Sequence, residues 1–597
     1  MTTAKTALVI GGGISGLASA ALLARDGYAV TLLEKNDQLG GRAGVWEKDG
    51  FRFDTGPSWY LMPEVFDHFF KLLGTSAEAE LDLVKLDPGY RVYFEDEFEP
   101  IDLRADRAAN LELFESIEPG SGVRMAGYLD SAEQTYELAK EYFLYSSFEK
   151  LGPVFTAGPV LKRLPRLVRL LTEPLASFAG HTVKDPRLVQ VLGYPAVFLG
   201  SSPYAAPSMY HLMSHLDLDE GVLYPKGGIA AVIEAIERLA RAEGVQIVTG
   251  ADVTRIVMAA DGTAAPAPQP VDAYDYETTM YDTDVIDRDA LARLLAGEEP
   301  GAAGTGSSAK AQANAQTAKA TDAAVPAAGP AGSTAGRPHV GGVHYTDTEG
   351  HAHSLEADIV VSTADLWHTE TALLLPELQT YPESYWDKRT AGPSALLVLL
   401  GVEGELPQLD HHTLFFTKDW KSNFGKIFDD LEIPEPASLY VCKPSATDSD
   451  VAPEGHENLF VLVPLPADPS IGAGGVAGAG DPRVEELADT VIEQIATWAG
   501  IPDLASRVTV RRTIGPADFE NTLNSWRGTA LGPAHTLRQS AMFRSRNVSA
   551  KVDGLYYAGG STTPGIGLPM CLISAELVLK RLHGVTTTTA LPEPLSL

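Results

Sequence analysis

The stretch that decides the fold runs from Ala7 to Arg42 and reads ALVIGGGISGLASAALLARDGYAVTLLEKNDQLGGR. Its first four residues are apolar and predict a buried parallel strand, because strands covered on both faces are hydrophobic throughout. A helix is predicted over residues 15–25, where apolar side chains recur at helical spacing, and Gly27 ends it as a C-cap. Residues 28–33 predict a second strand. The whole pattern indicates the strand–helix–strand unit of a doubly wound α/β fold.

Three glycines, Gly11, Gly13 and Gly16, follow the first strand in G-x-G-x-x-G spacing, and Glu34 ends the second strand. Gly11 allows a tight turn, Gly13 lets a pyrophosphate approach the backbone, and Gly16 lets the helix pack against the strand. The helix N-terminus then offers free N–H groups and its dipole to phosphates, and Glu34 can accept hydrogen bonds from a ribose diol. Glycine spacing alone arises easily by chance in a chain with 56 glycines. Together with the strand, the helix and the terminal acid, it predicts a dinucleotide site.

The residues after Glu34 favour FAD over NAD. Gly40, Gly41 and Arg42 complete the pattern E-x5-G-G-R. This extension resembles the large flavoprotein group that contains amine oxidases and carotene desaturases. A second glycine pair lets the chain pass close to the pyrophosphate, and Arg42 can neutralise its charge.

Length and composition limit the class of protein. A chain of 597 residues can form two or three domains, and its net charge of -33 argues against nucleic acid as a partner, since phosphates would repel it. Two cysteines, Cys442 and Cys571, are too few for a disulfide scaffold or a thiolate metal site and fit a reducing cytoplasm. The first residues run straight into the first strand, and no apolar run reaches the roughly 18 residues that span a bilayer, so we expect neither a signal peptide nor a transmembrane helix.

A basic amphipathic stretch at 161–171 nevertheless indicates contact with a membrane surface. Its sequence, LKRLPRLVRLL, places leucines on one side of a helix and Lys162, Arg163, Arg166 and Arg169 on the other. Such a helix in an acidic protein is typical of docking to anionic lipid, although a helix packed on the core with a solvated basic face has the same pattern. The predicted location is therefore the cytoplasm, peripherally on the inner face of the cell membrane.

The pattern along the chain divides it into seven segments. Parts of an FAD-binding domain are predicted at 1–122, 221–260, 338–390 and 511–597, a helical substrate and membrane-associating region at 123–220, and a substrate-domain sheet at 391–510. The remaining segment, 261–337, is rich in Ala, Gly, Thr and Pro, and burial of so few large apolar side chains cannot offset the entropy cost of ordering it. We predict that this segment is a disordered insertion.

Individual elements follow from periodicity. Helices are predicted at 229–242 and 484–498, where apolar residues share one helix face, and strands at 245–248 and 253–258. Four stretches between 394 and 465 alternate like the strands of an antiparallel sheet that could form the wall of a substrate cavity.

A second glycine-rich unit lies near the C-terminus. Residues 554–582 read GLYYAGGSTTPGIGLPMCLISAELVLKRL, in which a strand ends at Gly559-Gly560 and a helix is predicted from Met570. The N-terminus of that helix can stabilise negative charge on a reduced flavin. Two such units at opposite ends of the chain imply a fold that closes around one cofactor.

This C-terminal stretch resembles the signature of the bacterial-type phytoene desaturases, in which a strand is followed by G-G-S-T-x-P-G-x-G-x-P. The resemblance covers nearly the whole chain outside 261–337 and includes DTGPSWYLMP, LYPKGG and PADFE. It departs from the family at Thr563, where many members carry His, at Ile566, where a small residue is usual, and in the long insertion. The implied architecture is α/β, with a Rossmann-like FAD-binding domain, an inserted mixed α+β substrate domain and a peripheral helical membrane-associating region.

The resemblance implies which residues hold FAD. In related flavoproteins the D-x-G-P segment passes beside the flavin ring, and the strand around Val253 lies next to the adenine. The expected cofactor-binding residues are Gly11, Gly13, Ile14, Ser15, Gly16, Glu34, Lys35, Gly41, Arg42, Gly56, Pro57, Ser58, Val253, Gly559, Gly560, Gly567, Leu568 and Pro569.

The resemblance also implies FAD-dependent dehydrogenation of phytoene to neurosporene, lycopene or a related carotene, with hydride transfer to flavin N5 and loss of a proton. The hydrocarbon substrate has to be bound by apolar burial, and oxygen or a quinone would reoxidise the flavin. Asp518 and Glu520 are candidate proton acceptors, each with a structural role as the alternative. No metal site is predicted, and His411-His412 is expected in a surface turn.

Other activities remain open from the sequence. A carotenoid oxygenase or ketolase of the same fold would act on terminal methyl groups, and a retinol-saturase-like polyene reductase would run the redox chemistry in reverse. A flavin-binding scaffold without turnover is a third alternative, against which both intact glycine turns argue. The oligomeric state, including a homo-oligomer, is left open.

Overall fold

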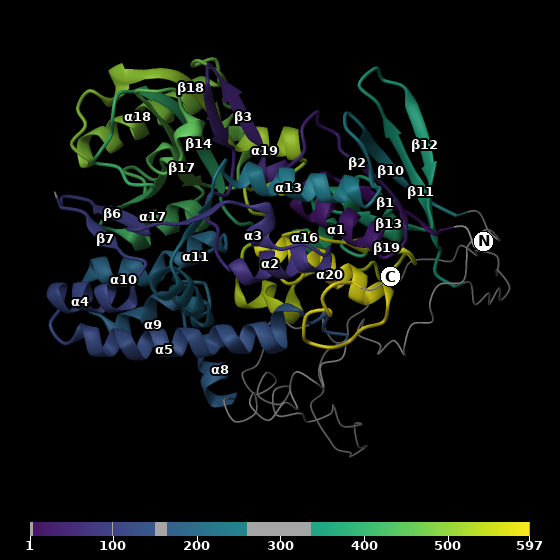
Figure 1. The fold of residues 1–597 in the computed structure, drawn as a ribbon, viewed down its shortest axis with the longest axis horizontal. Helices are drawn as coiled ribbons and strands as arrows, with labels where there is room; N and C mark the ends of the chain where they lie inside the picture. The colour runs from purple at the N-terminus through teal and green to yellow at the C-terminus, as the bar shows by residue number, and fades with distance from the viewer. Residues whose placement is uncertain (1–3, 98, 150–163, 260–335, 596–597) are drawn as a thin grey trace, which may run out of the picture.

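The computed structural model describes residues 4–97, 99–149, 164–259 and 336–595. A five-stranded parallel sheet with the order β19-β13-β1-β2-β9 lies in the right-hand half of the view in Figure 1. The strands are β1 (Thr6–Ile10), β2 (Ala29–Leu33), β9 (Gln246–Val248), β13 (Ile359–Ser362) and β19 (Leu555–Tyr557). The sheet thus joins segments from both ends of the chain with segments from its middle.

The two faces of this sheet belong to different cores, because side chains alternate along a strand. Ala7 and Val9 pack toward helices α1 (Ile14–Arg25), α2 (Pro63–Leu72), α13 (Ile229–Ala242) and α20 (Leu568–Leu582). Leu8 and Ile10 pack toward the opposite core, which contains the buried Trp386 and Trp526. Burial on both faces explains why the first strand is apolar throughout.

An antiparallel three-stranded sheet lies beside the parallel sheet. It has the order β10 (Asp252–Met258), β11 (Val340–Thr346) and β12 (Ala352–Glu356). The predicted insertion at 261–337 falls outside the described residues except for Gly336 and Arg337. β10 and β11 pair on either side of this segment, as expected for neighbouring strands.

A seven-stranded sheet forms the second large layer. Its order is β18 (Val508–Ile514), β14 (Ser394–Glu403), β17 (His456–Leu465), β16 (Leu439–Cys442), β15 (His412–Phe416), β6 (Tyr90–Phe94) and β7 (Ile101–Leu103). Helix α18 (Pro482–Trp498) covers one face through a shared apolar core. β6 and β7 fall inside the predicted 1–122 segment but extend this sheet, with β6 parallel to β15.

Helices from the predicted 123–220 region close the molecule on one side (Figure 1). They are α5 (Ser121–Ala139), η2 (Lys140–Leu144), α8 (Leu164–Thr172), α9 (Leu175–Thr182), α10 (Pro186–Gly193), α11 (Pro195–Phe198), η3 (Ser208–Leu212), α12 (Met213–His215) and η4 (Leu216–Glu220), with α4 (Arg107–Ile117) before them. Several of them share a core with β6 and β15, which fixes the helical region to the seven-stranded sheet.

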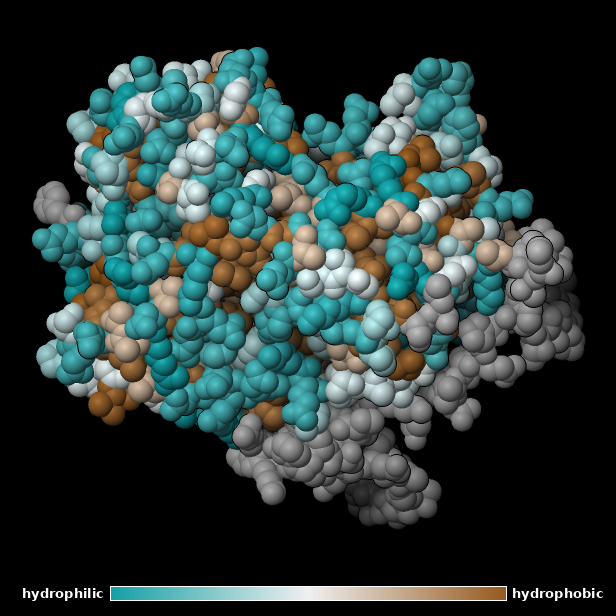
Figure 2. Space-filling model, viewed as in Figure 1, coloured by the Kyte–Doolittle hydropathy of each residue, from teal (hydrophilic) through white to brown (hydrophobic). Residues whose placement is uncertain are grey.

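Shorter elements complete the fold. They are the hairpin β3 (Val45–Lys48) and β4 (Phe51–Asp54), the pair β5 (Leu83–Lys85) and β8 (Leu223–Pro225), and the helices α3 (Ala77–Glu80), α15 (Leu366–Thr371), α16 (Glu383–Trp386), α17 (Trp420–Gly425) and α19 (Pro516–Leu523). On the face shown in Figure 2, hydrophilic side chains dominate and apolar ones gather in separate patches. Among the helices of the described residues, none is both long enough and apolar enough to cross a bilayer.

Candidate functional site

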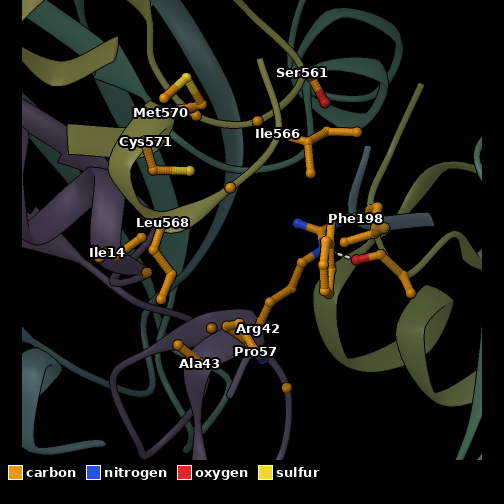
Figure 3. A pocket seen from close by; sticks show the side chains of 18 of the residues that line it. Ile14, Arg42, Ala43, Pro57, Phe198, Ser561, Ile566, Leu568, Met570 and Cys571 are labelled. Atoms are coloured by element: carbon orange, nitrogen blue, oxygen red, sulfur yellow. Dashed lines mark hydrogen bonds between the residues drawn. The ribbon is translucent and has the colours of Figure 1, made fainter. Parts of the chain in front are cut away.

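A cavity of about 550 Å³ lies where the parallel sheet, the helical region and the seven-stranded sheet meet. Its walls combine the glycine turns after β1 and β19 with aromatic and aliphatic side chains from the other two layers. In Figure 3, Ile14 and Leu568 lie on one side of the cavity and Phe198 on the other, with Arg42 and Pro57 along its edge. One end of the cavity is therefore lined by turns and the remainder by apolar side chains.

The turn after β1 has the geometry that the glycine spacing predicts. Gly11 has φ of +98°, a conformation that residues with a Cβ rarely adopt, and its N–H donates to the carbonyl of Leu33 at 2.8 Å. Gly13 precedes helix α1 and lines the cavity. Gly16 does not line it, and a Cβ at this position would lie 1.8 Å from the carbonyl oxygen of Gly11. Gly13 thus leaves space at the cavity, and Gly16 permits helix packing.

Glu34 lies at the end of β2 and faces the same turn. Its Oε2 accepts a hydrogen bond from the N–H of Gly12 at 2.6 Å, and its Oε1 accepts from the N–H of Asn36 at 2.9 Å. The residue is buried, yet it lines the cavity. Because a carboxylate has about four acceptor positions, it can still accept from a ligand hydroxyl.

The second glycine pair passes directly along the first turn. Gly40 donates from its N–H to the carbonyl of Gly12 at 2.9 Å, and a Cβ at Gly41 would lie 3.3 Å from the Cα of Gly13. Such close contact between two backbone segments requires residues without side chains. The pair thereby builds one continuous backbone surface at the cavity.

Arg42 links this surface to residues much later in the chain. Its Nε donates to the carbonyl of Ala530 at 2.8 Å, and one terminal nitrogen donates to the Ser525 hydroxyl at 2.9 Å. The guanidinium also lies 3.7 Å from the carboxylate of Asp365. Two neutral hydrogen-bond acceptors and one carboxylate therefore fix the positively charged guanidinium at the edge of the cavity.

Asp365 is a cavity residue that the sequence analysis did not select. It lies just after β13 and caps helix α15 by accepting from the N–H of Trp367 at 3.0 Å. Burial raises its pKa, and its Oδ2 has no hydrogen-bond partner among the described residues. The position after a central parallel strand could have indicated it, because ligands bind at the carboxyl ends of such strands.

The segment Gly56–Ser58 forms another edge of the cavity. A Cβ at Gly56 would lie 1.8 Å from the carbonyl oxygen of Arg42, so the two loops are in direct contact. Ser58 Oγ lies 2.7 Å from the Tyr440 hydroxyl, which in turn lies 2.7 Å from Nδ1 of His412. Ser58 and Tyr440 line the cavity, so this chain of polar groups leads from its wall into the protein.

The C-terminal glycine unit closes the opposite edge. Gly559 has φ of +120° and its N–H donates to the Ser574 hydroxyl at 3.0 Å, while α20 begins at Leu568. The buried Arg544 donates to the carbonyl oxygen of Gly560, and burial lowers its pKa to about 10. The start of α20 and this guanidinium together make that edge electrostatically positive.

The rest of the lining is mainly apolar. It includes Leu61 and Met62 from the segment before α2, Ala139, Phe143, Leu144, Met209, Leu212, Met213 and Leu216 from the helical region, and Leu397, Leu414, Phe416, Leu439, Phe460 and Leu462 from the seven-stranded sheet. A cavity of this kind binds a long hydrocarbon through burial of apolar area.

The structure brings most of the predicted residues together. Those that line the cavity are Gly11, Gly13, Ile14, Ser15, Glu34, Lys35, Gly41, Arg42, Gly56, Pro57, Ser58, Val253, Gly559, Gly560, Gly567, Leu568 and Pro569. Lys35 donates from Nζ to the carbonyl of Asn521 at 3.0 Å. The predicted residues outside the lining are Gly16, Asp518 and Glu520.

Asp518 has a structural contact. Its Oδ2 accepts from the N–H of Gly474 at 2.6 Å and from the N–H of Gly515 at 2.7 Å, which caps the start of α19. This carboxylate therefore joins two loops and does not itself line the cavity, although its neighbour Phe519 does.

The expectation that His411-His412 forms a surface turn is wrong. The two side chains are 2% and 0% exposed, and His412 begins β15. His412 pairs with Cys442 of β16 and its ring stacks on Trp59 with 4.5 Å between centroids, while the ring of His411 packs edge-on against Tyr224. The polar residues around the start of this strand gave no hydrophobic pattern from which a strand could be predicted.

Comparison with known proteins identifies relatives of this chain. Residues 14–273 match the family model of flavin containing amine oxidoreductases. The chain is 37% identical to a carotenoid 3,4-desaturase of Haloarcula japonica over 95% of this chain and 96% of that protein. It is 31% identical to a zeta-carotene-forming phytoene desaturase of Myxococcus xanthus, covering 97% and 94%. A 4,4'-diapophytoene desaturase of Staphylococcus aureus is 27% identical, covering 96% and 97%.

Solved structures share the fold. An oxidoreductase from Methanosarcina mazei aligns with a TM-score of 0.54 at 15% identity, covering 96% of this chain and 100% of that one. Cyclohexylamine oxidase from Brevibacterium oxydans aligns with a TM-score of 0.52 at 12% identity, covering 98% and 99%. At these identities the likeness concerns the fold alone.

Proposed function

This chain belongs to the carotenoid desaturase family, and we propose that within this family it converts phytoene to more conjugated carotenes of the neurosporene or lycopene type. It is an FAD-dependent oxidoreductase that desaturates carotenoids, as its similarity to three desaturases over almost its full length indicates. The observation that carries the choice of substrate is the apolar cavity beside the glycine turns, which suits an uncharged C–H substrate.

The residues at the turns fit FAD. Backbone at Gly13 and Gly41 comes together without side chains, and the N-terminus of α1 supplies N–H groups there. We propose that these turns hold the pyrophosphate, that Glu34 binds the ribose, and that the backbone of Val253 lies next to the adenine. When bound, FAD supplies the hydride acceptor.

The chain itself binds and orients the hydrocarbon and excludes water. Each Å² of apolar surface removed from water contributes about 25 cal/mol, so a long polyene gains its affinity without polar contacts. We propose that the lining of helical residues and sheet residues places one saturated bond of the substrate beside Gly56–Ser58, the loop that contacts the Arg42 backbone.

The test is an incubation of purified holoprotein with phytoene-loaded liposomes, followed by pigment spectra. New absorption bands at longer wavelength that depend on added FAD support the proposal and count the double bonds formed. Anaerobic samples, with and without a quinone, show whether oxygen or quinone is the final electron acceptor. Unchanged phytoene in a protein that retains FAD would contradict the choice of phytoene.

A second candidate is 3,4-desaturation of a carotene that is already conjugated. The observation that favours it is the 37% identity to the Haloarcula japonica enzyme, against 31% to the Myxococcus xanthus enzyme. A parallel incubation with a lycopene-type carotene distinguishes the two. Conversion of that carotene without conversion of phytoene would favour the second candidate.

We also propose that the helical region meets an anionic membrane on its cytoplasmic face, where the substrate enters. A hydrogen bond joins η3 to helix α8: the Ser208 hydroxyl donates to the carbonyl of Leu170 at 3.2 Å. The next residue of η3, Met209, lines the cavity. The predicted residues 161–163 lie outside the described residues. A charged helix beside the cavity supports entry from lipid.

Two arginines of the basic stretch, Arg166 and Arg169, have contacts within the protein, and substitution of the stretch tests the proposed membrane contact. Arg166 donates to the Ser131 hydroxyl at 2.6 Å, and Arg169 forms an ion pair with Glu173 at 2.8 Å. Replacing Arg163, Arg166 and Arg169 by Gln should reduce flotation with anionic liposomes in a salt-dependent way. The charge-matched control replaces three exposed arginines by Gln, namely Arg238 and Arg241 of α13 and Arg255 of β10 (Asp252–Met258). Equal flotation of both variants would contradict docking through this stretch.

A further inference from the structure

Two histidines and a cysteine meet in the wall behind the cavity. One potential ligand atom from each of His411, His412 and Cys442 lies within 4.8 Å of the other two. All three residues are buried. His412 and Cys442 are directly paired partners on the antiparallel strands β15 and β16, which places their side chains on the same face of the sheet.

Each imidazole has a hydrogen-bond partner at one nitrogen. Nδ1 of His411 lies 2.7 Å from the Thr447 hydroxyl, and Nδ1 of His412 lies 2.7 Å from the Tyr440 hydroxyl. A hydroxyl oxygen can accept the Nδ1–H of a neutral imidazole, which leaves the lone pair on Nε2 available. Histidines that ligate metals are held in this way.

The other nitrogen of each ring has no hydrogen-bond partner among the described residues. The Nε2 atoms of His411 and His412 are both buried and unsatisfied. A buried polar atom without a partner is uncommon, and two of them on adjacent residues beside a thiol require an explanation. Both imidazoles are buried, and the neutral imidazole nitrogen is the form that ligates a metal.

We propose that His411, His412 and Cys442 form a binding site for a zinc ion. Two imidazoles and one thiolate are ligands that Zn²⁺ accepts, and the fourth position is open to water. Tetrahedral zinc places its ligand atoms roughly 3.5 Å apart, so binding would draw these three atoms together from separations of up to 4.8 Å. Binding displaces the proton from the Cys442 thiol to solvent, and no electron is transferred.

The electrostatic surroundings include both signs. The negative charges of Asp54 and Asp448 act on Cys442 and His411, respectively, and favour a cation at the cluster. The ammonium of Lys443 opposes this, but it donates to the carbonyl of Leu406 at 2.8 Å and lies 3.6 Å from Glu457. One thiolate and two nearby carboxylates offset the charge of a divalent ion.

The position suggests what the ion would do. His412 is hydrogen-bonded to the Tyr440 hydroxyl, and this hydroxyl is hydrogen-bonded to Ser58 at the edge of the cavity. A metal at Nε2 of His412 would fix the ring and hence this chain of hydroxyl groups. The site would therefore brace the cavity wall, independently of which carotene the enzyme uses.

The experiment measures metal in the FAD-loaded full-length protein. After incubation with Zn²⁺ and exhaustive dialysis, we expect about one zinc per chain by elemental analysis. Cys442→Ser and His412→Gln should each lose it. Cys571→Ser is the matched control, because it removes the other cysteine at a position outside the cluster, and it should keep the zinc.

Cobalt gives a second measurement that does not depend on variants. Addition of Co²⁺ to the wild-type protein should give d–d bands beyond the flavin absorption and a sulfur-to-cobalt charge-transfer band. This result holds even where Cys442→Ser fails to fold. Absence of both stoichiometric zinc and the cobalt bands would overturn the proposal and indicate water at the Nε2 atoms. Equal zinc in wild type and folded Cys442→Ser would overturn it as well.

Discussion

The carboxylate of Glu34 accepts a hydrogen bond from the backbone N–H of Gly12 at 2.6 Å, which joins the end of β2 to the turn after β1. This bond orients the acid toward the place where the ribose of FAD is proposed to lie. The same residue thus has a structural contact and a proposed ligand contact, and a substitution affects both.

We expect Glu34→Ala to weaken FAD binding by roughly 10- to 100-fold, because a hydrogen bond to a charged group contributes about 1.5–3 kcal/mol. Flavin fluorescence during titration of the apoprotein measures the affinity. Asp37→Asn, which changes an exposed acid three residues later, is the control. An unchanged Kd for Glu34→Ala would exclude the proposed ribose contact.

Gly13→Ala should impair FAD binding, whereas Gly16→Ala should impair folding stability. A methyl group at Gly13 meets only Gly40 O at 3.8 Å and Gly41 Cα at 4.0 Å, so the fold tolerates it while the proposed pyrophosphate site is obstructed. At Gly16 the methyl group would lie 1.8 Å from Gly11 O, so the turn must open, at a cost of roughly 3 kcal/mol.

Thermal denaturation of the apoproteins and their FAD content separate these effects. Gly13→Ala should keep its Tm and lose FAD, whereas Gly16→Ala should lose Tm. The same loss of Tm in both variants would show that Gly13 is needed for packing rather than for the cofactor.

Much of this site could be predicted from the sequence because the turns are local. The spacing of Gly11, Gly13 and Gly16 and the acid Glu34 lie within one strand–helix–strand unit, and the structure shows that unit. By contrast, the carbonyl that holds Arg42 lies 488 residues away, at Ala530. No periodicity in the sequence indicates such a pairing.

The same limit applies to the cluster behind the cavity. His412 and Cys442 become neighbours through strand pairing. β6, which comes from a distant part of the chain, pairs with β15 on its other edge. Register between strands depends on the complete sheet, so adjacent histidines could be mistaken for a surface turn.

Met213→Trp should reduce kcat/KM for the carotene by roughly 10- to 100-fold without loss of FAD. Met213 lines the helical side of the cavity, and filling a packed space costs about 1–3 kcal/mol. The control is Val123→Trp on α5, where the native side chain is 82% exposed. Unaltered turnover of Met213→Trp would mean that the polyene does not occupy this part of the cavity.

Asp518→Asn should retain turnover per bound FAD, because an amide oxygen can still accept from the N–H groups of Gly474 and Gly515. Asp518→Ala should lower stability by about 1 kcal/mol through loss of the cap. Stopped-flow turnover and denaturant titration are measured on both, with Glu520→Gln beside them. A loss of more than roughly 100-fold in Asp518→Asn at unchanged stability would instead make Asp518 the proton acceptor.

Stability should fall between about pH 6.5 and pH 9 because of His215. Burial lowers the pKa of this imidazole, but Asp219 at 3.1 Å and Glu220 at 3.3 Å outweigh burial and raise it to about 9. The folded protein therefore binds a proton more tightly than the unfolded chain. The gain is complete below the unfolded pKa and disappears as pH rises through the folded pKa, and solvent screening of this partly exposed ion pair limits it to roughly 1–2 kcal/mol.

Urea titrations of wild type and His215→Gln across this range measure the effect. The variant should lose the part of the slope that His215 contributes, and His344→Gln, at an exposed histidine, should keep the wild-type slope. A parallel slope in wild type and His215→Gln would assign the pH dependence to other groups.

The strand order of the parallel sheet also determines when the protein can bind FAD during its synthesis. β1 and β2 leave the ribosome early, whereas β19 and α20 are among the last elements to emerge. The second glycine turn arrives with them, so a nascent chain offers FAD only half of its enclosure. We expect cofactor capture to follow the emergence of α20, which makes bound flavin a marker of chains synthesised beyond the second glycine turn.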